Sequence, residues 1–230
     1  MSNNDSAIKI EAPDHDDRVE YEKTLREAVS RLESLPASAT AVDKARIDLD
    51  IAEAKTGLGE TAEAWELSRA AFDIFMENEM WQDAIESCEV MYNTGAPANI
   101  VALCHGIWLS VTYPVKPQTT ITMINYMIDE TPDNSDGAAV AAAVAHYIAG
   151  IRASDEEYES LSFITRNMLV RVAERHSQVK SQQELDMWMM KLELNDPQVF
   201  LPRLGRVLDI IVIDQWWIDR DALRAKLPQE

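Results

Sequence analysis

The chain has 230 residues, with 40 acidic and 21 basic side chains and a formal net charge of −19 at pH 7. This excess of negative charge repels a phosphate backbone, so nucleic acid is not expected as a ligand. Hydrophobic residues make up 47% of the sequence and there are only 7 glycines. This composition excludes a disordered chain and favours helices joined by short connections over an all-β fold.

Residues 1–15 are polar and acidic, and they are predicted to form a disordered tail before a single all-helical domain at 16–230. The N-terminus lacks the basic and then apolar layout of a secretory signal. No run approaches 18 apolar residues, the length typical of a membrane-spanning helix. A cytoplasmic protein without a membrane partner is therefore expected. In that compartment Cys88 and Cys104 are expected to stay reduced, with Cys88 a buried structural thiol.

Helical periodicity runs through the chain, interrupted by stop signals at Pro36, Gly57–Gly59, residues 95–97, 114–117 and 132–137. The alanine-dense segment after the last stop has small side chains that allow close packing, so it is expected at the centre of the fold. Residues 209–213 could form a strand, but the preceding apolar spacing favours a helix. The predicted helices are 16–34, 41–56, 59–77, 81–92, 98–111, 119–129, 138–151, 155–176, 182–192, 197–212 and 215–227.

Ten or eleven helices with short connections are typical of antiparallel helical hairpins. The predicted fold class is therefore all-α, built as an irregular α-solenoid or bundle.

Two segments, 58–66 and 79–86, resemble the turn and second-helix start of a tetratricopeptide repeat. The matching residues are Gly59, Ala64, Ala71, Trp81, Ala84 and Met91. Ala64 and Ala84 lie 20 residues apart, whereas the family repeats every 34 residues or so. The resemblance covers residues 42–94. It implies a scaffold of helical hairpins that binds another protein, and it does not identify an enzyme.

No motif for catalysis, metal binding or phosphate binding is found. The sequence has no His-Glu-x-x-His pattern, no Glu-x-x-His pattern, no glycine-rich phosphate loop and no nucleophile elbow. No cofactor or metal is expected. One enzymatic alternative stays open, an active site built around His105, His146 or His176 within a helical bundle.

The acidic side chains are unevenly distributed along the chain. From residue 70 to 151 the sequence holds ten acidic residues and a single basic one, Lys116. A stretch this poor in cations projects a negative field that favours a basic protein partner. The expected contact surface is the helical hairpin around residues 65–89, without nearby cations and with an aromatic anchor. Its residues are Glu77, Glu79, Trp81, Asp83 and Glu86.

A second candidate contact is the pair Trp216 and Trp217 on the predicted helix 215–227. Adjacent indoles on one helix point in different directions, so both cannot easily face one core. Either one of them is exposed at an interface, or they pin the C-terminal helix to the body. Trp and Met side chains left over from the core, as in residues 187–190, also allow a homo-oligomer.

The leading hypothesis is a non-enzymatic helical adaptor or accessory factor that binds another protein through an acidic surface. One alternative is the enzyme around the histidines. A further alternative is an inhibitor or immunity-type protein that masks a basic site.

Overall fold

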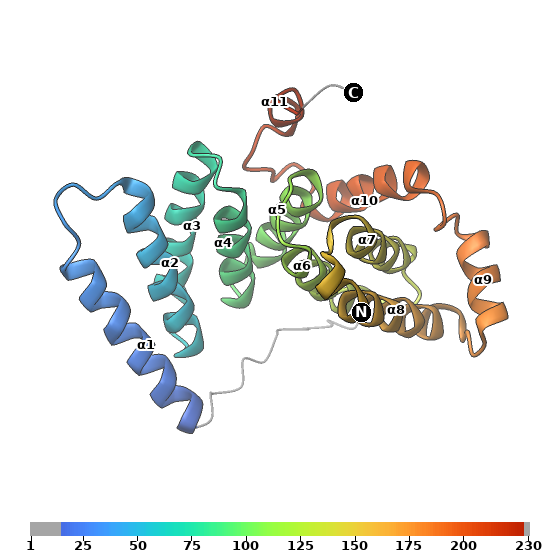
Figure 1. Cartoon of the computed structure of the whole chain (residues 1–230), viewed down its shortest axis with the longest axis horizontal. Helices are drawn as coiled ribbons and strands as arrows, with labels where there is room; N and C mark the ends of the chain where they lie inside the picture. The colour runs from blue at the N-terminus through green and yellow to red at the C-terminus, as the bar shows by residue number, and fades with distance from the viewer. Residues whose placement is uncertain (1–14, 228–230) are drawn as a thin grey trace, which may run out of the picture.

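The computed structural model describes residues 15–227 (Figure 1). Within this range the chain forms eleven α-helices and no β-strand, so the predicted all-α fold is confirmed. The predicted tail lies outside the described residues, apart from His15, at which the first helix begins. The helices are α1 (His15–Glu33), α2 (Ala41–Gly57), α3 (Thr61–Glu77), α4 (Trp81–Asn93), α5 (Asn99–Thr112), α6 (Pro117–Asp129), α7 (Asp136–Arg152), α8 (Asp155–Ser177), α9 (Gln182–Lys191), α10 (Pro197–Val212) and α11 (Arg220–Arg224).

Local hydrogen bonds explain where several helices begin. At the start of α2, the Asp43 amide donates to Thr40 Oγ1 and the Thr40 amide donates to the Asp43 carboxylate. Ser154 and Glu157 form the same reciprocal box before α8. Each box satisfies amide donors that a helix start leaves without a partner. After α2, Gly59 takes a positive φ of 81°, which glycine adopts without steric cost.

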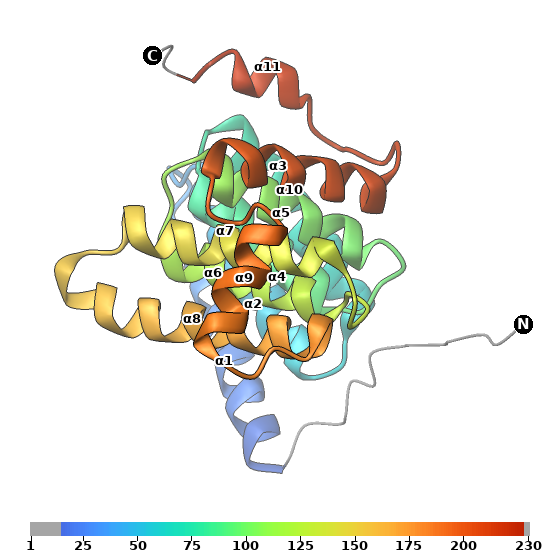
Figure 2. The ribbon, with the colours of Figure 1, turned by 90° about the vertical axis from the view of Figure 1, so that its right-hand side faces the viewer.

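The helices pack as an array in which each of the first eight contacts the next along the chain. The even-numbered helices α2, α4, α6 and α8 also contact one another in sequence, and α10 packs on the odd-numbered helices α5 and α7. The two views show α10 beside α7 and α11 apart from the other helices (Figures 1 and 2). This packing is compatible with a helical repeat. No helix among the described residues is both long and apolar enough to cross a bilayer.

The core is centred on α5 and α7. Every residue from Val101 to Ser110 is buried, as is the alanine-rich part of α7, so the expected central position of that helix is confirmed. Gly106 allows the helices to approach closely, because an added Cβ would lie 3.0 Å from the Cβ of Cys88 in α4 and 2.2 Å from Cε of Met123 in α6. Cys88 is buried, as expected.

Near the C-terminus one prediction is confirmed and one is wrong. The helix favoured over a strand at 209–213 is confirmed as far as Val212, where α10 ends. The helix predicted over 215–227 is wrong, since only Arg220–Arg224 are helical. The chain reverses at Ile213, which has a φ of 54°, and the following residues are held by side chains of α3 and α5 instead of by helical hydrogen bonds.

Candidate functional site

A polar groove lies on the face formed by α2, α4 and α6, the even-numbered helices that contact one another. Its volume is about 260 Å³, and three of its lining side chains are carboxylates against a single arginine. This set of side chains is called the acidic groove below. The lining residues are Arg46, Leu49 and Glu53 of α2, Glu86, Glu89, Val90 and Asn93 of α4, and Thr119 of α6.

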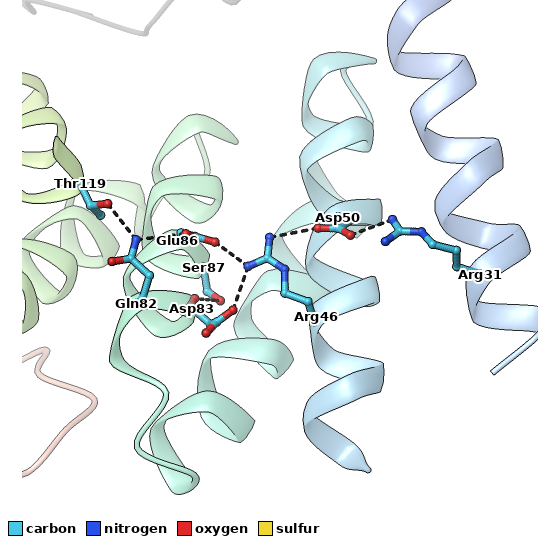
Figure 3. Close-up of polar contacts among 8 residues, drawn as sticks. All are labelled: Arg31, Arg46, Asp50, Gln82, Asp83, Glu86, Ser87 and Thr119. Carbon is cyan, nitrogen blue, oxygen red and sulfur yellow. Dashed lines mark hydrogen bonds and ion pairs between the residues drawn. The ribbon is translucent and has the colours of Figure 1, made fainter. Parts of the chain in front are cut away.

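Arg46, which lines the acidic groove, is the centre of a polar network (Figure 3). Its Nη1 donates to Asp83 Oδ1 at 3.0 Å and also to Glu86 Oε2, while its Nη2 donates to Asp50 Oδ1 at 3.0 Å. Arg31 of α1 reaches the other oxygen of Asp50 at 2.8 Å. These bonds raise the pKa of Arg46 further above its usual range, although burial acts against them. The network therefore links α1, α2 and α4 through paired charges.

Gln82 continues the network from α4 to α6. Its side-chain amide donates to Glu86 Oε1 at 3.1 Å and to Thr119 Oγ1 at 2.8 Å, and its carbonyl oxygen accepts from the backbone amide of Lys116 at 3.1 Å. The Glu86 carboxylate is thus oriented from two sides, by Arg46 and by Gln82 (Figure 3).

Glu89 is a half-buried carboxylate of the acidic groove. Its Oε1 accepts a hydrogen bond from the Tyr126 hydroxyl at 3.1 Å. Burial raises the pKa of the Glu89 carboxyl, the Tyr126 hydrogen bond lowers it, and the nearby charges of Glu53 and Glu86 raise it again. The net shift is upward. Glu89 therefore occupies a position where a cation would relieve unfavourable charge.

The acidic hairpin expected from the sequence is only partly free of cations. Asp83 and Glu86 pair with Arg46, and Glu79 pairs with Lys226 at 2.9 Å. The premise that these acids lie without nearby cations is therefore wrong for all three. The cations come from α2 and from the C-terminal end, which are far away in sequence. Glu77 is exposed and makes no ion pair within the described residues.

Trp81 has an aromatic partner inside the protein. Its ring stacks on Tyr113, with centroids 3.8 Å apart and planes inclined by 8°, and the side chain is half-buried. The proposed anchor therefore also fastens the start of α4 to the end of α5.

Trp216 and Trp217 are half-buried in the non-helical segment after α10. The Trp217 amide donates to His105 Nε2 at 2.8 Å, and its ring stacks on the His105 imidazole with centroids 4.4 Å apart. Trp216 Nε1 donates to Asp209 Oδ1 at 3.1 Å, and the Arg220 guanidinium lies 3.9 Å from its ring centroid. Both indoles pin the C-terminal segment to the body, which matches one of the two expected roles.

The three histidines considered for catalysis have separate hydrogen-bond partners. His105 is buried and bonds to the Val101 carbonyl and the Trp217 amide. His146 contacts Thr165 Oγ1 at 2.9 Å. His176 contacts Asp136 Oδ1 at 3.0 Å. Among the described residues, no group of three or more His, Cys, Asp or Glu side chains is arranged to hold a metal ion. Cys104, beside His105 in sequence, is buried, and this raises the pKa of its thiol to about 12.

Sequence reasoning missed the part played by Glu53, Glu89 and Tyr126. A usable signal exists, because Glu86, Glu89 and Asn93 recur at spacings of three and four and so share one face of α4. Arg46 and Glu53, seven residues apart, share one face of α2 in the same way. The pairing of these two faces across helices follows only from the tertiary packing.

No protein-family model, curated protein or solved structure matches this chain. The tetratricopeptide resemblance of residues 42–94 accordingly stays a prediction, while the consecutive packing of the helices is compatible with a helical repeat.

Replacing Arg46 by methionine is expected to lower the free energy of unfolding by about 1–2 kcal/mol, because three carboxylates lose their shared counter-charge in a partly exposed site. The matched control is Lys44→Met, which removes a single pair with Asp48 from a side chain that is 61% exposed. Its expected loss is below about 0.5 kcal/mol. Urea unfolding at neutral pH measures both changes, and equal losses would contradict a central role of Arg46.

Proposed function

We propose that this chain is a non-enzymatic helical adaptor or accessory factor that binds a basic segment of another protein in the acidic groove. The observation that carries the proposal is the charge of the groove: Glu53, Glu86 and Glu89 face a single guanidinium, which Asp50 and Asp83 already share. Glu53 makes no ion pair within the described residues. A lysine or arginine side chain of a partner fits this excess of carboxylate, and its charge favours the ionised form of Glu89.

The proposed contact surface lies on α2, α4 and α6, whereas the surface expected from the sequence was the α3–α4 hairpin. Glu86 belongs to both surfaces, whereas Glu79 and Asp83 already have cations within the chain. The net charge of −19 adds a long-range field that accelerates encounter with a basic partner.

The enzymatic alternative gains no support from the histidines, because His105, His146 and His176 lie among different neighbours. The inhibitor or immunity-type alternative shares the same charge chemistry. It differs in that its partner is an active enzyme whose activity falls on binding.

The test compares capture of partners from native extract by the wild type and two charge-matched variants. The groove variant carries Glu53→Gln with Glu89→Gln, which removes two charges and keeps an oxygen that accepts from Tyr126. The control carries Glu20→Gln with Glu33→Gln on exposed positions of α1. The groove variant is expected to bind the captured partner at least about tenfold more weakly, and the control is expected to bind normally.

The association rate of the wild-type complex should also fall as sodium chloride is added, because salt screens the attraction between exposed charges. Equal binding by the groove variant and the control would place the contact elsewhere. Inhibition of the captured partner's own activity would favour the inhibitor alternative.

A further inference from the structure

The C-terminal strap, residues 213–227, leaves α10 through an unusual hinge. Ile213 has φ 54° and ψ −128°. This left-handed conformation is a genuine outlier for a β-branched residue. The strap therefore begins at a strained residue, and any conformation that straightens the chain there relieves the strain.

The strap is anchored by Trp217 on Trp65, Arg69 and Phe72 of α3 and His105 of α5, four residues called the aromatic cluster. The Trp217 ring lies edge-on to Trp65 and Phe72, with centroids 6.1 and 6.0 Å away. The Arg69 guanidinium lies 4.6 Å from the same ring centroid, close enough for a cation–π interaction. With the stacking and hydrogen bond to His105, these contacts make Trp217 the main point of attachment.

Beyond Trp217 the strap is attached through Arg220 and through contacts near the surface. No residue of α11 is buried, and a cavity of about 310 Å³ lies between α5, α10 and Arg224. Arg220 pairs with Asp209 of α10 at 2.6 Å and lies over the Trp216 ring, and the Arg224 guanidinium lies 5.5 Å from the Trp108 ring centroid. Further along are the exposed Lys226–Glu79 pair and a long hydrogen bond of 3.4 Å from the Tyr113 hydroxyl to the Leu223 carbonyl. Exposed ion pairs and long hydrogen bonds contribute little to stability. No residue of the strap is buried, so the strap can open without disturbing the helical core once the contacts of Trp217 and Arg220 are broken.

Uncovered apolar side chains lie at the hinge. Ile210 and Ile213 are 76% and 66% exposed. Ile210 also lines an apolar cavity of about 420 Å³ between α5, α10 and the connection from α6 to α7. Large apolar side chains gathered around a cavity mark a surface that another chain covers.

We propose that two copies of this chain exchange straps, so that Trp217 of each copy packs on the aromatic cluster of the other. The partner is a second copy because the aromatic cluster already makes specific contacts with this strap, through ring packing and the hydrogen bond from the Trp217 amide to His105. Exchange straightens both Ile213 hinges and brings them side by side, where the exposed isoleucines of one copy cover those of the other. Exchange of an identical element is a low-cost route to a dimer, and a strained hinge promotes it.

Disulfide trapping between separate chains tests the exchange. Glu79→Cys and Lys226→Cys are made as single variants, since these exposed side chains meet at 2.9 Å, whereas Cys88 and Cys104 are buried. Mixed at high concentration and oxidised, the two variants are expected to form a covalent heterodimer. A mixture of Lys226→Cys with Glu20→Cys, on α1, serves as the control and is expected to stay uncrosslinked. A double variant that closes only on itself, with no crosslink in the mixture, would overturn the proposal.

Two substitutions of Ile213 provide a second test, in which light scattering measures the dissociation constant of the dimer. Ile213→Gly accepts the left-handed conformation, so it is expected to raise the dimer dissociation constant at least about tenfold. Ile213→Pro forbids that conformation and is expected to lower the dissociation constant. Both substitutions lie outside the core, so the folded helical content serves as a control. Dissociation constants that do not change, or that change in the opposite order, would contradict exchange through this hinge.

Discussion

Phe72→Ala is expected to lower the free energy of unfolding by about 3–5 kcal/mol, the usual effect of removing a buried phenylalanine ring. Phe72 is 1% exposed, and it lies edge-on to His105 at 6.3 Å and to Trp217 at 6.0 Å. Removing the ring would leave a cavity beside Trp217. The strap should therefore detach from α3 and α5 as the protein loses stability. Urea unfolding followed by circular dichroism measures the stability, and Trp fluorescence follows the strap.

The matched control is Phe163→Ala on α8, where the ring is 67% exposed. Removing it leaves no cavity, so a change within about 0.5 kcal/mol is expected. Similar losses for the two variants would show that Phe72 is not a core residue.

The second large effect is a pH dependence of stability that arises at His105. Burial lowers the pKa of His105, the hydrogen bond to the Val101 carbonyl raises it, and the charges of Arg69 and Arg220 lower it, so that the resulting pKa is about 4. Nδ1 must donate to that carbonyl, so Nε2 is the atom that accepts from the Trp217 amide. Protonation of Nε2 would therefore break the hydrogen bond to the strap and place a charge beside two guanidinium groups.

The direction of this effect follows from proton binding. Between pH 6.5 and 4 the unfolded chain takes up a proton at this histidine while the folded chain does not. The contribution of neutral His105 is therefore complete above pH 6.5 and decreases as the pH falls, by about 3 kcal/mol at pH 4. His105→Gln should remove this component, so the difference between wild type and variant should shrink on acidification. Nuclear magnetic resonance titration checks it directly, and a His105 pKa near 6.5 would contradict the linkage.

Most helix boundaries could be predicted because they depend on local residues. Pro36, Gly59 and the segment 132–137 stop helices through backbone chemistry that acts within a few positions. The central place of the helix at 138–151 could be predicted as well, because its alanine side chains are suited only to close packing. Predicting these features does not require knowing which residues they contact elsewhere in the fold.

The strap could not be predicted from periodicity, because its conformation is decided by partners far away in sequence. Trp217 finds Trp65 and His105, and these contacts override the helical preference of residues 215–219. The charge balance around α4 also depends on residues far away in sequence. The acids of α4 looked unbalanced along the chain, yet in space Arg46 and Lys226 lie beside them. Glu53 and Glu89 share a groove only because α2 contacts α4.

The isolated position of α1 has a consequence for how the protein unfolds. α1 packs on α2 through a small satellite core of Ala28, Ile47 and Ile51, whereas α5 and α7 belong to the large core and are bridged by α10. In a purely linear array, cooperativity passes only between neighbours. Here α10 closes a loop over the middle, so the centre opens only as one unit. α1 can fray on its own, because α2 also belongs to the large core. This end of the molecule is therefore a low-energy subglobal opening, and its centre is a foldon.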